Sequence, residues 1–246
     1  GTKVLVELST ESGEIREVDL ERRSVDLRPV RTKRLRDDSH TIGYLRITQF
    51  SESVPKKVEE ALQELKEKEV EGLILDLRNN SGGLVSSGIA VADSLLSEKP
   101  VVETKDRNGI KDAIISQKET SFDGPMVTLV NKGTASASEI LAGSLQDNER
   151  SILMGEQTYG KGLIQSLKSL GEDSGIAITV ASYLTPKGNN IQGQGITPDK
   201  LLDLPDAIEY GSSDDKWVRN AELFLDSLLE NKELTIQTSE LSNEQI

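Results

Sequence analysis

Alternating strand and helix patterns between residues 44 and 155 constrain the fold of this 246-residue chain more than any other feature. The apolar runs at 72–77 and 126–130 are typical of buried strands. Residues 51–70 instead carry apolar side chains every three or four positions, which indicates an amphipathic helix. A helical pattern follows each buried run. Strands that alternate with helices favour an α/β fold with a mainly parallel sheet.

Further periodic segments flank that region. Strand patterns occur at 3–8, 15–21, 44–50, 101–104, 151–155, 163–167 and 176–184. We expect the strands around 163–184 to be antiparallel additions to the sheet. Residues 214–231 form a last amphipathic helix, and the polar tail 232–246 is expected to be frayed. The basic stretch 31–36 and the polar segment between 104 and 126 receive no element.

Composition excludes several classes of function. The net charge is −13 and the isoelectric point is near 4.7, which argues against nucleic-acid binding and against electrostatic docking on anionic lipid. The absence of cysteine removes disulfides, thiolate catalysis and cysteine-ligated zinc. No apolar run reaches the roughly 18 residues of a membrane span. The composition is that of a chain that folds in water.

Two loops follow the buried strands, where α/β proteins place their functional groups. The first contains Gly82 and Gly83, whose backbone can adopt unusual conformations and lets a ligand approach main-chain N–H groups. The second reads NKGTASAS and brings Ser136 to a helix N-terminus, where negative charge is stabilised. A glycine turn and an ordinary helix cap explain the same residues, since Ser136 and Glu139 satisfy a capping box.

A nucleophilic serine needs a base, and the chain holds one histidine. His40 lies in the polar stretch RDDSHT, so we expect it to be solvated on the surface. Lys161 stands between two glycines and just before an apolar strand, unlike the lysines of the charged runs. Gln165 follows four residues later, about 13 Å away along a straight strand, so a bend is needed before its amide can reach the amine.

The chain contains four distinctive sequence blocks: NNSGG (79–83), TASASEILAGSLQD (134–147), GEQTYGKGLIQS (155–166) and SYLTPKGNNIQGQGITPD (182–199). In this order they resemble the successive signatures of the C-terminal processing peptidases, also called tail-specific proteases. The resemblance extends from about residue 43 to 200. The blocks are similar in particular to those of cyanobacterial and chloroplast members, which trim a photosystem II reaction-centre subunit. It implies a serine nucleophile at Ser136 and a lysine base 25 residues later, at Lys161. A glutamine four residues further on, here Gln165, orients the lysine in several members.

The same resemblance implies the groups that support this dyad. The oxyanion hole is expected at the N–H of Ala137 together with the N–H of Gly82 or Gly83. A supporting role falls to Asp147, eleven residues after the serine. The resemblance implies no metal and no organic cofactor.

The family also implies an architecture and a context. Its members have a ClpP/crotonase-like α/β core, here with a C-terminal helical extension, and usually a PDZ domain before the core. We expect residues 1–9 to be the last strand of a PDZ domain that is otherwise missing from this fragment, 10–210 to be the protease core, and 211–246 to be the C-terminal helix and tail. Substrates would be proteins with unstructured C-terminal tails, in the periplasm, the cell envelope or the thylakoid lumen.

Two alternatives remain open at this point. A crotonase-type enzyme would share the core and the oxyanion hole but act on acyl thioesters, and would need a carboxylate acid–base pair. A non-catalytic or inactive peptide-binding member of the same fold would tolerate replacement of Ser136 and Lys161.

Overall fold

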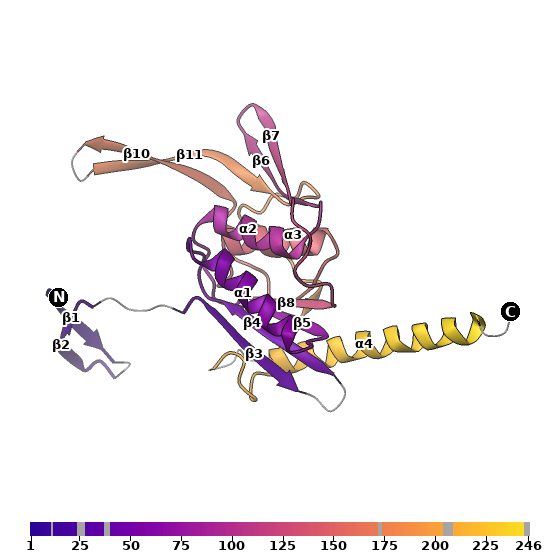
Figure 1. Cartoon of the computed structure of the whole chain (residues 1–246). Helices are drawn as coiled ribbons and strands as arrows, with labels where there is room; N and C mark the ends of the chain where they lie inside the picture. Colours follow the sequence, from indigo (N-terminus) through magenta and orange to yellow (C-terminus); the bar gives the residue numbers. More distant parts are fainter. Residues whose placement is uncertain (11, 24–27, 37–39, 172–173, 204–208, 244–246) are drawn as a thin grey trace.

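A six-stranded sheet forms the centre of the structure, a computed structural model that describes residues 1–10, 12–23, 28–36, 40–171, 174–203 and 209–243 (Figure 1). Its strands, in spatial order, are β12 (Lys200–Leu201), β9 (Ile152–Gly155), β8 (Met126–Val130), β5 (Gly72–Asp76), β4 (Thr41–Ile47) and β3 (Val30–Arg36). All neighbouring pairs are parallel except β3 with β4. Every residue of β5 and β8 is buried, as their continuous apolar sequences predict. The expected parallel α/β core is confirmed.

Helices cover both faces of this sheet. They are α1 (Val54–Glu67), α2 (Val85–Leu95), α3 (Ala137–Asp147) and α4 (Lys216–Asn243). Consecutive strand residues point to opposite faces, so Leu75 packs in the core shared with α1, α2 and α3, while Ile74 packs with Trp217 and Leu225 of α4. Figure 1 shows α4 leaving the sheet and extending beyond the body of the molecule. No helix among the described residues is long and apolar enough to cross a lipid bilayer.

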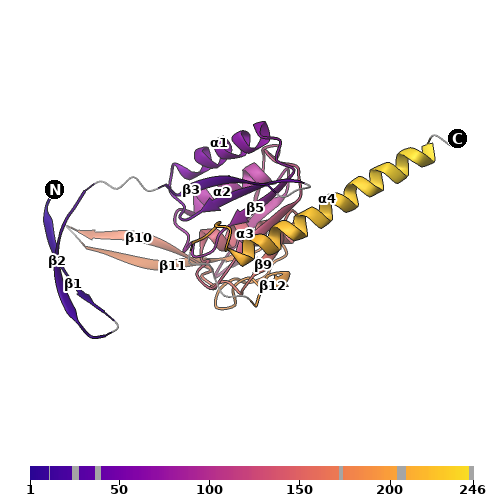
Figure 2. The ribbon, with the colours of Figure 1, turned by 90° about the horizontal axis from the view of Figure 1, so that it is seen from below.

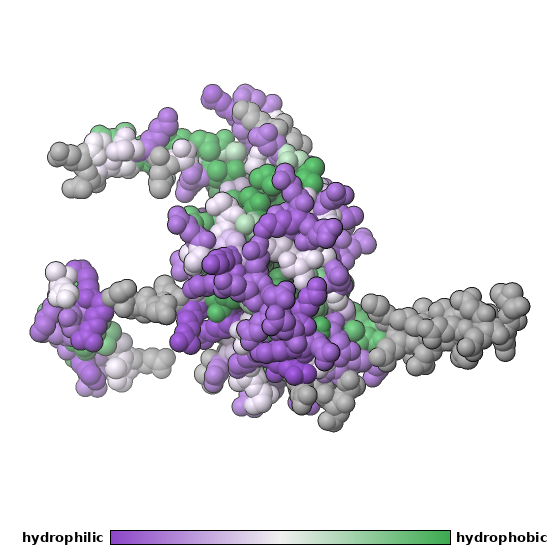
Figure 3. All heavy atoms as spheres, viewed as in Figure 1, coloured by the Kyte–Doolittle hydropathy of each residue, from purple (hydrophilic) through white to green (hydrophobic). Residues whose placement is uncertain are grey.

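A second, antiparallel sheet flanks the first. Its order is β10 (Leu163–Gly171), β11 (Ser174–Leu184), β6 (Pro100–Asp106) and β7 (Gly109–Ile115). The β10–β11 hairpin projects from the body as an arm (Figures 1 and 2). Large apolar side chains are exposed on it, visible as green patches in Figure 3: Leu163, Leu170, Ile176, Ile178 and Val180. The strands expected around 163–184 are antiparallel, as predicted, but they belong to this second sheet and are not additions to the six-stranded sheet.

The N-terminal residues form a separate hairpin. The strands β1 (Lys3–Ser9) and β2 (Ile15–Glu21) pair with each other and with no strand of the core. In Figure 2 this hairpin lies away from the six-stranded sheet. Its assignment to the end of a PDZ domain stays a prediction, as do the domain boundaries.

Several expectations from the sequence were wrong. Strands β3, β7 and β12 occupy segments for which no strand was expected. Helix α4 continues to Asn243, through most of the tail that was expected to fray, and residues 244–246 lie outside the described part of the chain. His40 is 6% exposed, not solvated, because its Nδ1 lies 3.1 Å from Glu71 at the edge of the core.

Candidate active site

The two loops singled out by the sequence meet at the carboxyl ends of the neighbouring strands β5 and β8. The carbonyl of Asn80, in the loop after β5, accepts the N–H of Ala135 at 3.0 Å and the hydroxyl of Ser138 at 2.9 Å. The hydroxyl of Thr134 donates to the carbonyl of Leu77 at 2.9 Å. These hydrogen bonds hold the loop that precedes α3 against the glycine loop, as expected for a site at the carboxyl edge of a parallel sheet.

The structure distinguishes the two serines. Ser138 is fully buried, and its hydroxyl donates to the backbone carbonyl of Asn80. This hydrogen bond gives Ser138 a structural role. Ser136 is half-buried and stands at the N-cap of α3 with φ 58° and ψ −118°. A positive φ is rare for residues other than glycine and costs on the order of 1–3 kcal/mol. Such backbone strain is concentrated at functional sites. Ser136 therefore lies where the helix N-terminus begins and where a substrate can reach it.

Glu139 joins the serine to the lysine. Its carboxylate is completely buried, and its Oε2 accepts the N–H of Ser136 and the N–H of Lys161, both at 2.8 Å. Its Oε1 accepts the N–H of Gly160 at 2.7 Å and the hydroxyl of Thr158 at 2.6 Å. One oxygen thus fixes the distance between the backbones of two residues that are 25 positions apart. The capping box expected from the sequence contains the first of these bonds, but no sequence spacing indicated the other three.

Lys161 is brought to the serine through its backbone, but its side chain is exposed. Among the described residues, its amine makes no hydrogen bond to the hydroxyl of Ser136. The bend expected in this segment is present, since Gly160 has φ +90° and a β-bulge separates Ile164 from Gln165. Gln165 is exposed on β10, and within the described chain its amide makes no hydrogen bond to Lys161.

Asp147 lies at the opposite end of α3 from Ser136. Eleven residues of α-helix span about 16 Å, so this carboxylate is not adjacent to the serine. Its Oδ2 accepts the N–H of Lys187 at 2.8 Å, in the turn that follows β11. The structure therefore does not bring Asp147 together with the other candidate residues.

The backbone N–H groups of the glycine loop and of the start of α3 differ in whether they have an acceptor. The N–H of Ala137, in the first turn of α3, and the N–H of Gly83 have no acceptor among the described residues. The N–H of Gly82 donates to Oδ1 of Asn80 at 2.9 Å and is occupied. Gly82 has φ +100°, and a Cβ there would lie 2.8 Å from the Cβ of Ser136 and 3.1 Å from the nitrogen of Ala137. Only glycine lets the loop approach the serine so closely.

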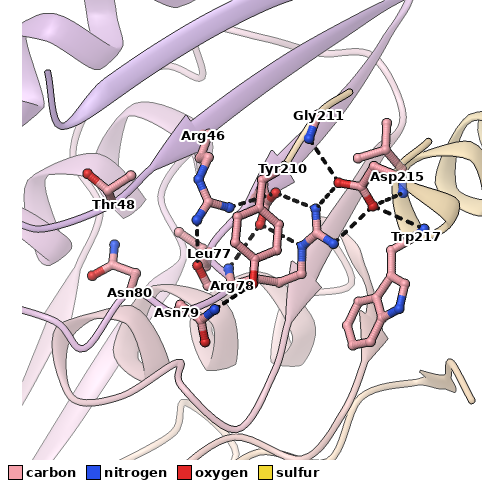
Figure 4. Close-up of polar contacts among 12 residues, drawn as sticks. Arg46, Thr48, Leu77, Arg78, Asn79, Asn80, Tyr210, Gly211, Asp215 and Trp217 are labelled. Carbon is pink, nitrogen blue, oxygen red and sulfur yellow. Dashed lines mark hydrogen bonds and ion pairs between the residues drawn. The ribbon is translucent and has the colours of Figure 1, made fainter. Parts of the chain in front are cut away.

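A buried ionic cluster lies at the start of the glycine loop (Figure 4). The guanidinium of Arg78 is fully buried and contacts both Asp76 and Asp215, with Nη2 at 2.7 Å and 2.6 Å from their Oδ2 atoms. Burial alone would lower the pKa of Arg78, but the hydrogen bonds to the two carboxylates raise it above its ordinary value. Burial also opposes ionisation of Asp215, yet hydrogen bonds from Arg78 and from the N–H of Gly211 lower its pKa. The pKa shifts of Arg78 and Asp215 both favour the charged forms of this pair.

A family model of peptidase family S41 matches residues 41–202, and the chain belongs to this family. It is 47% identical over 208 residues to a carboxyl-terminal-processing protease of the cyanobacterium Synechocystis sp., with 83% of this chain and 48% of the relative covered. It is 45% identical over 173 residues to the chloroplastic C-terminal processing peptidase of Tetradesmus obliquus, covering 68% of this chain and 37% of the relative.

The chain also resembles a solved structure of a C-terminal processing protease. The photosystem II D1 C-terminal processing protease superimposes with a TM-score of 0.69 at 38% identity, over 82% of this chain and 56% of that chain. The resemblance to C-terminal processing peptidases, and to cyanobacterial and chloroplast members in particular, is confirmed. The chain spans about half the length of the curated relatives it matches.

Proposed function

We propose that this chain is the catalytic core of a serine peptidase that cleaves protein substrates near their C-termini, with Ser136 as nucleophile and Lys161 as general base. The observation that carries the proposal is the shared contact on Glu139, whose Oε2 accepts the N–H groups of Ser136 and Lys161 at 2.8 Å each. This shared acceptor supports the pairing, because it holds the backbones of the two residues close together. In this proposal, one site contains a nucleophile, a general base and an oxyanion hole.

In the proposed reaction, neutral Lys161 takes the proton of the Ser136 hydroxyl while Oγ attacks the scissile carbonyl. The C–N bond then breaks, and the protonated amine of Lys161 gives its proton to the leaving amine. A water molecule, activated by the same lysine, hydrolyses the acyl-enzyme. Because the lysine side chain is exposed, we infer that the bound peptide itself covers it.

The tetrahedral oxyanion is assigned to the N–H groups of Ala137 and Gly83. The sequence left Gly82 and Gly83 open, and the hydrogen bond from Gly82 to Asn80 favours Gly83. Gly82 contributes its lack of a side chain, which keeps the loop against the serine. Donors of this kind act on charge that develops only in the transition state, so they contribute to kcat.

Gln165 is proposed to orient the amine of Lys161 once a peptide is bound. Asp147 is assigned a positioning role, because it holds the turn at Lys187 and lies far from the reacting atoms. No metal and no organic cofactor enter this mechanism.

The substrate is proposed to be an unstructured C-terminal tail. Strand β10 begins two residues after Lys161 and is an edge strand of its sheet, so an extended peptide can pair with it through main-chain hydrogen bonds. Such pairing makes weak demands on side chains. The relatives in cyanobacteria and chloroplasts favour an extracytoplasmic setting, either the thylakoid lumen or the periplasm and cell envelope.

The test is proteolysis of a folded protein that carries an unstructured apolar C-terminal tail. Wild type is compared with Ser136→Ala, Lys161→Ala and the matched control Ser138→Ala. We expect cleavage to be abolished in the first two variants and retained in the third. Normal cleavage by both Ser136→Ala and Lys161→Ala would refute the mechanism and favour a peptide-binding role, whereas turnover of an acyl-coenzyme A thioester would favour the crotonase-type alternative.

A further inference from the structure

We propose that the segment Tyr210–Trp217, at the start of the C-terminal helix, is a positioning element for the oxyanion hole. The inference rests on the proposed function, since it concerns the loop that carries Gly82 and Gly83. It assigns no group that touches the substrate. In this proposal, the segment holds that loop in register with the serine.

The first connection is the carboxylate of Asp215. Its two oxygens receive both terminal nitrogens of Arg78, at 3.1 Å and 2.6 Å, with both side chains completely buried (Figure 4). The same carboxylate accepts the N–H groups of Trp217 and Val218, at 3.2 Å and 3.3 Å, and so begins α4. Bidentate arginine–carboxylate pairs fix geometry as well as charge. The start of α4 and the start of the glycine loop are therefore held by one group.

The second connection is the side chain of Tyr210. Its ring stacks on the guanidinium groups of Arg46 and Arg78, at 4.0 Å and 4.4 Å from the ring centroid. Its hydroxyl accepts Nδ2 of Asn79 at 2.5 Å. Figure 4 shows the ring lying between the two arginines and directly over the first residues of the loop.

These contacts continue to the serine. The N–H of Asn79 donates to Oδ1 of Asn131 at 2.9 Å, and Nδ2 of Asn131 donates back to Oδ1 of Asn79 at 3.1 Å. Asn131 belongs to the loop that ends at Ser136. The next residue, Asn80, holds the N–H of Gly82 with its side chain and the N–H of Ala135 with its carbonyl. A displacement of Asn79 or Asn80 would therefore change the distance from the oxyanion donors to the serine.

The experiment uses three variants of the full chain. Tyr210→Phe keeps the ring and removes the hydroxyl that accepts from Asn79. Asp215→Asn weakens the pair with Arg78. The matched control, Lys33→Met, removes the hydrogen bond from Lys33 Nζ to the carbonyl of Gly211, at 2.8 Å, which attaches the same segment to β3 and not to the loop. For each variant, kcat, KM, Tm and the affinity for a peptide aldehyde are measured, because the aldehyde forms a tetrahedral adduct that needs the oxyanion hole.

We expect Tyr210→Phe to lower kcat and the aldehyde affinity by about 5-fold with KM unchanged, as the loss of one ordinary hydrogen bond predicts. Asp215→Asn should lower both by about 10-fold or more and also lower Tm. Lys33→Met should leave kcat and aldehyde affinity as in wild type.

Two results would overturn the inference: unchanged kcat and aldehyde affinity in Tyr210→Phe, or an equal loss in Lys33→Met. If Asp215→Asn does not fold, Tyr210→Phe decides alone. The proposed function has its own check in the same assay, since an active Ser136→Ala variant refutes that function, whereas an inactive Ser136→Ala beside an unaffected Tyr210→Phe refutes the positioning role only.

Discussion

The two halves of the candidate site differ in how they are built. Around the serine, Ala137, Ser138 and Glu139 are completely buried, and the backbone is fixed by loops from two parallel strands. Around the lysine, Lys161 and Gln165 are exposed at the base of the projecting β10–β11 arm (Figure 1). The proposed nucleophile and oxyanion donors are therefore held in place by the core, whereas the proposed base lies on the exposed surface. We infer from this difference that a bound substrate completes the site.

Ser136→Ala tests the preorganised half and should have the largest effect. Removing the nucleophile eliminates the acyl-enzyme path, so kcat should fall by about 10⁴-fold or more. Rates are measured with a tailed protein substrate. Ser138→Ala, on the same helix turn, should retain kcat and lose about 1 kcal/mol of unfolding free energy, because it removes one buried hydrogen bond. Loss of activity in Ser138→Ala alone would transfer the nucleophile to that residue.

Lys161→Ala tests the exposed half. Because the variant removes the proposed general base, kcat should fall by about 10³-fold. A general base acts only in its deprotonated form, so the wild-type rate should rise with pH, and this rising limb should vanish in the variant. A pH–rate profile of kcat/KM measures it. A limb that persists in Lys161→Ala would assign the base to another group.

Glu139→Gln tests the connection between the halves. The amide nitrogen of glutamine presents hydrogens to groups that are themselves donors, so at least one of four buried hydrogen bonds is lost. We expect kcat to fall by about 10- to 100-fold, and the unfolding free energy to fall by about 1–3 kcal/mol. Steady-state kinetics and denaturant unfolding measure both quantities. A variant that loses stability with full kcat would reduce Glu139 to a helix cap.

Acid unfolding tests the ionic cluster beneath the preorganised half. The pKa of Asp215 is lowered in the folded protein, so its contribution to stability is complete above its unfolded pKa of about 3.9 and is lost as the pH falls through the folded value. Unfolding free energies measured between about pH 2 and pH 6 should therefore drop with acid in wild type. The slope should be smaller in Asp215→Asn, and equal slopes would contradict the assignment.

The contrast between buried and exposed regions also determines which elements could be predicted from the sequence. Buried strands such as β5 and helices such as α1 have periodic apolar patterns, and both were predicted. The strand was expected at 72–77 and ends at Asp76, whereas the helix was expected at 51–70 and spans Val54–Glu67. Strand β3 was missed because its residues Arg31, Lys33 and Arg34 are polar, as an edge strand allows. Strand β12 is two residues long and carries no period of its own. Such elements are set by tertiary pairing.

The site divides in the same way. Ser136, Lys161 and the two glycines were proposed from local sequence and from the family resemblance. The role of Glu139 was not, because three of its partners lie at 158–161 and only the folded chain brings them together. Asp215 was missed for the same reason, since Arg78 is 137 positions away. Local patterns identify residues that act chemically, whereas residues that position them are defined by long-range contacts.

Gln165→Ala should have the smallest effect and gives the sharpest test of substrate-completed assembly. In the free protein the amide of Gln165 is exposed, so its removal should leave Tm unchanged, as should the control Gln63→Ala on the surface of α1. If a bound peptide brings Gln165 to Lys161, kcat should fall by about 3- to 10-fold in Gln165→Ala only, since one hydrogen bond to the base is lost. Steady-state kinetics with the tailed substrate measure this. Equal kcat in the two variants would mean that the base half is completed without Gln165, and that burial of Lys161 by the peptide is sufficient.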